Sequence, residues 1–267
     1  MNGIAYFVDK KIWITGASSG IGKEITFQLA KAAKQLIISG RNADVLNEVR
    51  IQSGFPEKII VLAMDQSSRE SVKTACDFLL SEGEVPDVVF CNGGVSQRAY
   101  AISTEDEVER YVFETNYFSQ IYIAKRFIQA RVNARELHLV ITSSLLGKWG
   151  VPYRSTYAAT KHALHGYFDS LRMETRNSGV KITLVLPGFI NTPISVNAVN
   201  EGGKINGAMD KNQAGGISAF DCVRKIIKGV AVGKQEFSVG GKETMGLWLR
   251  RYFPNLFDRV LIKKNPR

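Results

Sequence analysis

The sequence predicts an α/β protein of one domain, in which a doubly wound parallel sheet of about seven strands carries helices on both faces. Strand-like and helix-like segments alternate along all 267 residues, which is the pattern of consecutive strand–helix–strand units. Short apolar runs, such as those at 87–91 and 137–142, are typical of buried strands. No internal repeat, low-complexity linker or domain boundary interrupts the alternation.

The first strand, at 12–15, leads into a glycine-rich turn, TGASSGIG at 15–22, and a helix is predicted over 21–34. Glycines let a ligand approach the backbone, and free N–H groups at a helix start attract phosphate. The spacing is G-x-x-x-G-x-G rather than the better-known G-x-G-x-x-G. A tight turn without a ligand is the alternative. The candidate ligand-binding residues here are Gly16, Ser18, Ser19, Gly20, Ile21 and Gly22.

The second strand, at 35–40, ends at Arg41 and Asn42. An acidic residue about 20 positions beyond the glycine turn would bind the 2′-hydroxyl of an NAD ribose. Arg41 stands there instead, and a guanidinium suits the 2′-phosphate of NADP in both charge and geometry. We therefore predict an NADP(H) contact at Arg41, with Asn42 beside it. A solvated surface arginine is the alternative.

Two further strands end in candidate cofactor contacts. Asp65 ends one of them, in a place from which a side chain can reach an adenine. Asn92, Gly93 and Gly94 end the other, and a strand that stops at glycines lets a ligand lie against its backbone. The elements predicted in this region are helices at 43–52 and 70–80 and strands at 58–64 and 87–94.

A long helical pattern extends over 104–133, with Asn116 in its middle. Asn is a poor residue for a helix interior, because its side chain competes for backbone hydrogen bonds. A tolerated surface position is the commoner explanation of such a residue. Because of the motifs around it, we nevertheless take Asn116 as a candidate functional residue.

Tyr157 and Lys161 are four residues apart in a helix predicted over 155–177, so both side chains lie on one face. A free tyrosine has a pKa of about 10. A nearby cation lowers the pKa of a phenol, which makes the pair an acid–base device. Ser144 follows the strand at 137–142 and could hold a substrate oxygen while Tyr157 moves a proton. A chance pair on a helix is the alternative.

The last third of the chain contains a strand from 180 that breaks at Pro187 and Gly188. A long irregular segment follows at 194–218, and loops of this length are usually lids, binding loops or disordered. We expect this segment to be a substrate lid. The tail at 243–267 alternates apolar and basic residues. The remaining elements are a helix at 219–232 and a strand at 236–239.

The net charge is +10, and residues 242–267 hold seven Lys or Arg against two Asp or Glu, a balance of +5. A basic protein can bind nucleic acid or anionic lipid, or favour a phosphorylated cofactor. The basic residues are scattered and no stacking platform is evident, so we expect no nucleic-acid partner. Three widely spaced cysteines argue against a disulfide framework or a metal site. A reducing cytoplasm is the simplest setting for such cysteines, and we expect a cytoplasmic protein. We find neither a signal peptide nor an apolar run of about 18 residues.

Six features in order and spacing resemble the short-chain dehydrogenase/reductase family, over residues 8–241. They are TGASSGIG, CNGG at 91–94, Asn116, Ser144, Tyr157 and Lys161. The segments SGRN, LPGFINTPI and MDKNQAGGIS are most similar to an NADP-preferring subgroup, that of 11β-hydroxysteroid dehydrogenase-like and dehydrogenase/reductase member 7-like proteins. The family commonly has Asn-Asn-Ala-Gly where this chain has CNGG. The resemblance implies a Rossmann fold.

The resemblance also implies roles. Tyr157 would be the general acid or base, Ser144 would hold the substrate oxygen, and Lys161 would bind the nicotinamide ribose and lower the pKa of Tyr157. Asn116 would hold a water that links Lys161 to solvent. Asn92 would steady the central strands. The remaining implied cofactor contacts are Gly93 and Gly94, Asp65 at the adenine, and Pro187, Gly188, Ile190 and Thr192 at the nicotinamide.

The predicted function is NADP(H)-dependent interconversion of a carbonyl and a secondary alcohol on a small-molecule substrate, and the apolar residues of the 194–218 loop and the tail favour a lipophilic one. By resemblance we expect a homodimer or homotetramer. One alternative is a cofactor-binding sensor without useful catalysis, since a fold does not fix a function. Another is a membrane-surface protein whose tail lies on anionic lipid. Against the latter, the tail could pack over the substrate cleft or against another subunit.

Overall fold

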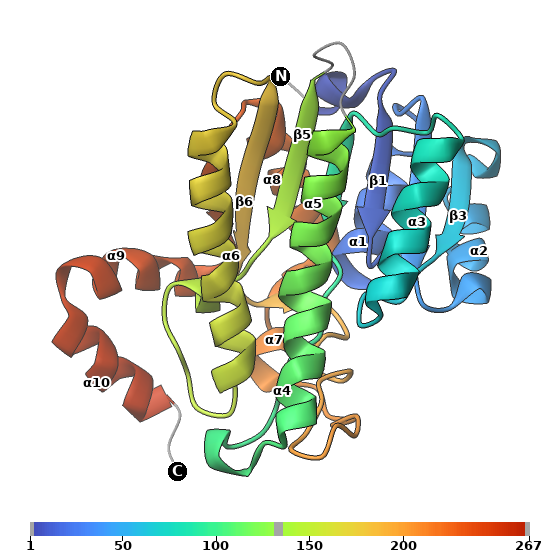
Figure 1. The fold of residues 1–267 in the computed structure, drawn as a ribbon. Helices are drawn as coiled ribbons and strands as arrows, with labels where there is room; N and C mark the ends of the chain where they lie inside the picture. The colour runs from blue at the N-terminus through green and yellow to red at the C-terminus, as the bar shows by residue number, and fades with distance from the viewer. Residues whose placement is uncertain (1–2, 131–135, 265–267) are drawn as a thin grey trace.

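The computed structural model describes residues 3–130 and 136–264 and confirms the predicted fold class. All seven strands of the main sheet are parallel and follow the order β3-β2-β1-β4-β5-β6-β9 (Figure 1). The strands are β1 (Lys11–Thr15), β2 (Gln35–Gly40), β3 (Ile59–Ala63), β4 (Val88–Cys91), β5 (Leu137–Thr142), β6 (Val180–Pro187) and β9 (Glu236–Val239).

Helices cover both faces of the sheet, and alternate residues of each strand supply the two cores. In β1, Ile12 and Ile14 face one layer and Trp13 faces the other. The first layer holds α1 (Gly20–Leu29), α2 (Ala43–Gln52) and α8 (Ala219–Ala231). The second holds α3 (Arg69–Ser81), α5 (Ser119–Gln129) and α6 (Ser155–Glu174). A sheet buried on both faces explains the continuous apolar strands.

The strand order reverses between β1 and β4, where the chain crosses from one half of the sheet to the other. In open parallel sheets, ligands bind outside the carboxyl ends of the strands at such a switch point. The glycine turn after β1 and the CNGG segment after β4 both lie there. The topology therefore brings these two motifs together from positions some 75 residues apart, as the hydrogen bond between Thr15 and the Asn92 N–H shows.

The long helix expected over 104–133 is in fact divided. It consists of α4 (Asp106–Phe113), a π-helical turn at Glu114–Phe118 and then α5. Asn116 lies in the π turn, and such turns are frequent at functional sites. The expected end, Asn133, lies outside the described residues. The prediction of helical structure was correct. The π turn adds only one residue to one turn, which is too small a change in the apolar periodicity to be recognised in the sequence.

Two late segments of the chain leave the sheet: residues 194–218 lie beyond the carboxyl ends of the strands, and the tail extends to one side of the body (Figure 1). Within the segment predicted as irregular, 194–218, lies a short helix, α7 (Lys211–Ala214). Its last residues form β8 (Ile217–Ser218), which pairs with β7 (Ile190–Asn191). The tail forms two helices, α9 (Gly246–Tyr252) and α10 (Pro254–Lys264). None of the described helices is long and apolar enough to cross a bilayer.

Candidate active site

One cavity of about 1040 Å³ lies at the carboxyl ends of the strands. It extends from the glycine turn after β1, past Tyr157, to the tail helices. Seventeen of the twenty predicted site residues line it: Gly16, Ser18, Ser19, Gly20, Ile21, Arg41, Asp65, Asn92, Gly93, Gly94, Ser144, Tyr157, Lys161, Pro187, Gly188, Ile190 and Thr192. Gly22, Asn42 and Asn116 do not line it. The segments predicted separately therefore meet in one space.

The glycine turn is packed so closely that side chains would not fit. Gly16 has a φ of +67°, and a Cβ there would lie 2.5 Å from the Gly93 Cα. A Cβ on Gly22 would lie 2.3 Å from the Gly16 carbonyl oxygen, which explains its place behind the cavity wall. Ser19 precedes α1 without capping it, so the helix start offers free N–H groups. This bare turn at a helix N-terminus fits the phosphates of a dinucleotide.

Asn92 joins the ends of three strands. Its backbone N–H donates to Thr15 Oγ1 over 3.1 Å, and its side-chain amide donates to the Thr15 carbonyl over 3.3 Å. Its Oδ1 accepts from Thr142 Oγ1 over 3.3 Å. These bonds connect β1, β4 and β5, so the geometry gives Asn92 the bracing position that the resemblance implies. A Cβ on Gly93 would collide with the side chain of Gln66, a buried cavity residue that sequence reasoning missed.

The residues predicted at the adenosine end differ in position. Arg41 is exposed at the cavity rim, with Nη1 3.4 Å from the Tyr111 hydroxyl. Asn42 instead caps α2: its Oδ1 accepts from the N–H groups of Asp44 and Val45. The physical reason is that Asn is among the best N-cap residues. Asp65 reaches the cavity, although one of its oxygens accepts from Ser67.

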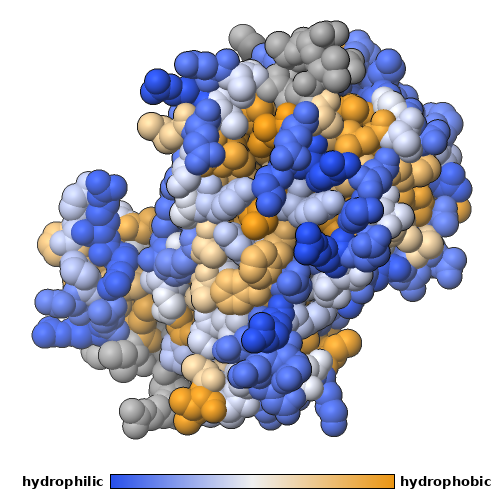
Figure 2. Space-filling model, in the orientation of Figure 1, coloured by the Kyte–Doolittle hydropathy of each residue, from blue (hydrophilic) through white to orange (hydrophobic). Residues whose placement is uncertain are grey.

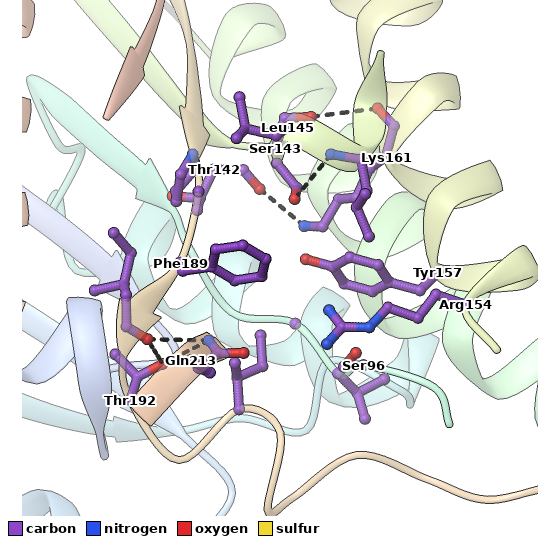
Figure 3. A pocket seen from close by; sticks show the side chains of 18 of the residues that line it. Ser96, Thr142, Ser143, Leu145, Arg154, Tyr157, Lys161, Phe189, Thr192 and Gln213 are labelled. Carbon is purple, nitrogen blue, oxygen red and sulfur yellow. Dashed lines mark hydrogen bonds between the residues drawn. The ribbon is translucent and has the colours of Figure 1, made fainter. Parts of the chain in front are cut away.

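Tyr157 and Lys161 lie side by side on α6, and both are almost completely buried at the centre of the cavity (Figure 3). Lys161 Nζ lies 5.7 Å from the centre of the Tyr157 ring and donates to the Thr142 carbonyl over 2.9 Å. Burial lowers the pKa of Lys161 to about 8. A lysine with such a pKa keeps most of its charge at pH 7 but loses the proton within the weakly alkaline range.

The pKa of Tyr157 differs from expectation. Burial raises it above the ordinary value, because a phenolate loses more hydration than a phenol. In the described part of the chain, the groups that pull it down are the Arg154 guanidinium and a hydrogen bond from Ser144. Lys161, which was expected to do this, donates to Thr142 instead. Arg154 was not predicted, since a lone arginine before a helix carries no recognisable signal.

The neighbouring serines have different surroundings. Ser144 lines the cavity, and its Oγ accepts from the Leu146 N–H over 3.1 Å, which fixes the hydroxyl next to Tyr157. Ser143 Oγ lies 3.0 Å from His165 Nε2 and 3.3 Å from the Lys161 carbonyl. Ser143 therefore joins the end of β5 to α6, while Ser144 presents its hydroxyl to the cavity.

Asn116 is completely buried and connects the loop after β4 to α6. Its Oδ1 accepts from the Val95 N–H, and its amide donates to the Val95 carbonyl and to Thr160 Oγ1, over 2.8 to 3.2 Å. A Cβ on Gly94 would lie 3.0 Å from Asn116 Oδ1 and 3.7 Å from Lys161 Nζ. Gly94 therefore keeps open the space between Asn116 and Lys161, where the resemblance places a water.

The other end of the cavity is closed by the tail. Glu243 Oε1 accepts from the N–H groups of Phe189 and Gly241, each over 2.9 Å, which fastens the start of the tail beside Gly188. The ring of Phe257 on α10 packs edge-on against Trp149, with centroids 5.0 Å apart. Leu249 and Leu261 also line this end. The tail therefore packs over the cleft, which was one of the two alternatives to a lipid-bound tail in the sequence analysis.

Taken together, the switch-point cavity and its glycine turn define a nucleotide-binding protein of the Rossmann class. A family model described as short chain dehydrogenase matches residues 10–202. The chain belongs to the short-chain dehydrogenase/reductase family. The predicted resemblance to member 7-like proteins is confirmed by curated relatives at about a third identity.

Two of these relatives and two solved structures illustrate the match. Dehydrogenase/reductase SDR family member 7B of Xenopus laevis is 34% identical, over 96% of this chain and 82% of its own. Dehydrogenase/reductase SDR family protein 7-like of Drosophila melanogaster is 28% identical, over 96% of this chain and 80% of its own. A Burkholderia phymatum short-chain dehydrogenase/reductase in complex with NAD has a TM-score of 0.80 at 20% identity, over 94% and 96%. A Burkholderia cenocepacia short-chain dehydrogenase in complex with NADP has a TM-score of 0.79 at 19% identity, and the match covers 96% of this chain and 98% of its own.

Proposed function

We propose that this protein is an NADP(H)-dependent oxidoreductase that interconverts a carbonyl and a secondary alcohol. The observation that carries the proposal is the shared cavity. Ser144, Tyr157 and Lys161 open into the same space as the glycine turn, so a dinucleotide bound at the turn can place its reactive end beside an acid–base group. Family membership supports the reaction class.

Each residue of the centre has a defined task in carbonyl reduction. A bound nicotinamide supplies the hydride. Ser144 and Tyr157 donate hydrogen bonds to the carbonyl oxygen, and Tyr157 gives it the proton as negative charge develops there. Lys161 holds its ammonium beside the phenol. Asn116 fixes the loop above Lys161 and faces the gap at Gly94, through which a water can return the proton.

The test is NADPH consumption across a panel of ketones, aldehydes and quinones, with Tyr157→Phe alongside. We expect this variant to bind NADPH normally and to lose turnover about a thousandfold, within the range of a lost general acid. Tyr153→Phe is the matched control, because its hydroxyl lies in the same cavity but bonds Tyr100. Turnover retained in Tyr157→Phe would disprove the assignment. Binding without turnover in the native protein would favour the sensor.

The preference for NADP(H) rests on Arg41. Its exposed guanidinium lies at the cavity rim just beyond β2, where an acidic residue would bind the ribose of NAD. We expect Arg41→Asp to weaken NADPH binding at least tenfold, roughly the worth of one charge-assisted hydrogen bond, and to leave NADH almost unchanged. Arg176→Asp makes the same charge change on an exposed residue outside the cavity. Equal effects of the two variants would remove the phosphate role.

Membrane contact by the tail is a second candidate function, favoured by one observation. While Phe257 is buried, Tyr252, Phe253 and Leu256 are about half exposed on the same two helices, with Arg250 and Arg251 nearby. Aromatic and basic residues together suit an anionic bilayer surface. Co-sedimentation with phosphatidylserine vesicles, lost at high salt and in a Tyr252→Ser, Phe253→Ser double variant, would support it; no sedimentation at low salt would reject it.

We also propose that the protein forms homo-oligomers through α5 and α6. Figure 2 shows a strip of apolar surface over these two helices. Next to these helices, Phe113 at the end of α4 packs against Tyr117 and Phe118 of the π turn, Tyr117 contacts Tyr167 on α6, and Phe118 is 45% exposed. Exposed aromatic clusters of this kind mark interaction surfaces. Light scattering should give a dimer or tetramer for the native chain and a smaller species for Phe118→Asp.

A further inference from the structure

Arg154 stands at the start of α6, three residues before Tyr157, and its side chain is 13% exposed. Figure 3 shows its guanidinium beside the Tyr157 ring, with both side chains directed into the cavity. Burying a guanidinium is costly unless it has a partner. The position of Arg154 in the wall of a cavity, close to the phenol, therefore needs an explanation.

Its partner comes from the segment at 194–218. Asp210 Oδ2 lies 3.4 Å from Arg154 Nη2 and 2.6 Å from Arg98 Nη2. Asp210 Oδ1 accepts from the N–H groups of Asn212 and Gln213 at the start of α7. One carboxylate thus holds two guanidiniums from two other segments, and the cluster keeps one net positive charge beside Tyr157.

Arg154 and Tyr157 each influence the pKa of the other. Among the charges around Tyr157, Arg154 is the one that most opposes the effect of burial on the phenol pKa. Burial lowers the pKa of Arg154, and the charge of Tyr157 opposes this effect together with the charge and hydrogen bond of Asp210. Lys161, the expected cation, donates to the Thr142 carbonyl and does not contribute to the lowering of the Tyr157 pKa.

We propose that Arg154 is a positioning residue for Tyr157: it holds a positive charge beside the phenol, and Asp210 sets how much of that charge the phenol experiences. The inference rests on the proposed function, in which Tyr157 transfers the proton. It also gives the segment at 194–218 a chemical effect. When this segment is closed, Asp210 neutralises part of the charge; when it moves away, the phenolate is favoured.

The charged groups that face Tyr157 come from five parts of the fold. Lys161 on α6, Arg154 just before it, Arg98 in the loop after β4, Asp210 before α7, and Lys242 and Glu243 at the start of the tail line the same cavity, and Glu109 on α4 bonds the neighbouring Thr156. Of these, Arg154 and Asp210 can be changed with opposite expected effects. A structural disturbance would not produce opposite signs.

The experiment measures the titration of Tyr157 directly, in the cofactor-free protein, by NMR of ¹³Cζ-labelled tyrosine, with the signal assigned by Tyr157→Phe. Arg154→Met should raise the pKa of the phenol by about one pH unit, a tenfold fall in phenolate at a given pH. Asp210→Asn should lower it, because both guanidiniums lose their counter-charge. Asn retains the side-chain oxygen that caps α7, so this variant keeps the local fold. Arg154→Lys should titrate close to the native protein.

Arg98→Met is the matched control, since it removes the other guanidinium on Asp210 and leaves Arg154 in place. Its effect on the phenol should be smaller than that of Arg154→Met. The limb of the kcat/KM profile that reports Tyr157 should move in parallel with each NMR shift. Shifts of the same sign in Arg154→Met and Asp210→Asn, or no shift in either, would overturn the proposal. If the NMR shifts had the expected signs but neither the native protein nor any variant showed turnover, the effect of Arg154 on Tyr157 would stand and only the proposed function would be contradicted.

Discussion

The two ends of the cavity are built in different ways. The end near β1 is made mainly of backbone: Gly16, Gly93 and Gly22 pack so closely that a single added methyl would meet another main chain or an amide. The end near the tail is made of side chains from distant segments. There, Asp210 joins two arginines, and Phe257 packs against Trp149.

This difference has a physical consequence. Main-chain contacts at the ends of paired strands cannot open without breaking the sheet, so the glycine end is as stable as the core. Ion pairs and one aromatic contact at the edge of the fold can open locally at a smaller cost in free energy. We therefore expect one end to hold a constant ligand in a fixed place and the other to admit and release a variable one.

The largest effect is expected from Gly22→Ala, at the backbone end. The new Cβ would lie 2.3 Å from the Gly16 carbonyl oxygen, which cannot move without disturbing β1. We expect the free energy of unfolding to fall by about 3 kcal/mol and cofactor binding to be lost, as measured by urea unfolding and fluorescence titration. Gly40→Ala is the control, because its Cβ would meet only side-chain atoms at 3.6 Å or more. Similar behaviour of the two variants would contradict the rigid-end interpretation.

The backbone end was also the part that the sequence could predict. A strand, a glycine turn and a helix are local in the chain, so TGASSGIG carries its own geometry. β2, α2, β5 and β9 have the predicted bounds for the same reason. A capping residue and a ligand-binding residue look alike in a sequence: the structure shows that Asn42 caps α2 through Asp44 and Val45, and its cofactor contact stays a prediction.

A second effect is expected at Lys161, where the two ends meet. Its pKa, about 8 in the folded protein, is about 10.4 when unfolded. Below pH 8 the folded state therefore holds an ammonium that it disfavours, at a cost of about 3 kcal/mol, and this cost disappears as the pH rises from 8 towards 10.4. In the cofactor-free protein, Lys161→Met should be more stable than the native chain at pH 7.

The measurement is urea unfolding of both proteins between pH 6 and pH 10, a range that spans the folded pKa of about 8. The stability difference should be constant at the acidic end and should shrink as the native protein loses the proton from Lys161. A difference that does not change with pH would show that Lys161 is fully charged in the folded state. Lys161→Met should in any case be inactive, since the centre loses its ammonium.

The side-chain end could not be predicted, because it depends on contacts between segments that are far apart in the chain. Arg98, Arg154 and Asp210 come from three separate segments, and nothing near any one of them indicates the other two. The alternating apolar and basic pattern of the tail was compatible with a cleft, a subunit or a lipid surface. Only the packing of Phe257 against Trp149 decides that one face covers the cavity.

The smallest global effect, and the clearest local one, is expected from Phe257→Ala. The ring is 4% exposed and contacts Trp149, so its loss should let α9 and α10 open about ten times more often, without unfolding the sheet. Trypsin should then cut faster after the exposed Arg250 and Arg251, while the melting temperature and cofactor affinity stay the same. Leu256→Ala is the control, because this neighbour on α10 is 51% exposed. If both variants were cut at the native rate, the tail would be no more labile than the glycine end, and the contrast between the two ends would be lost.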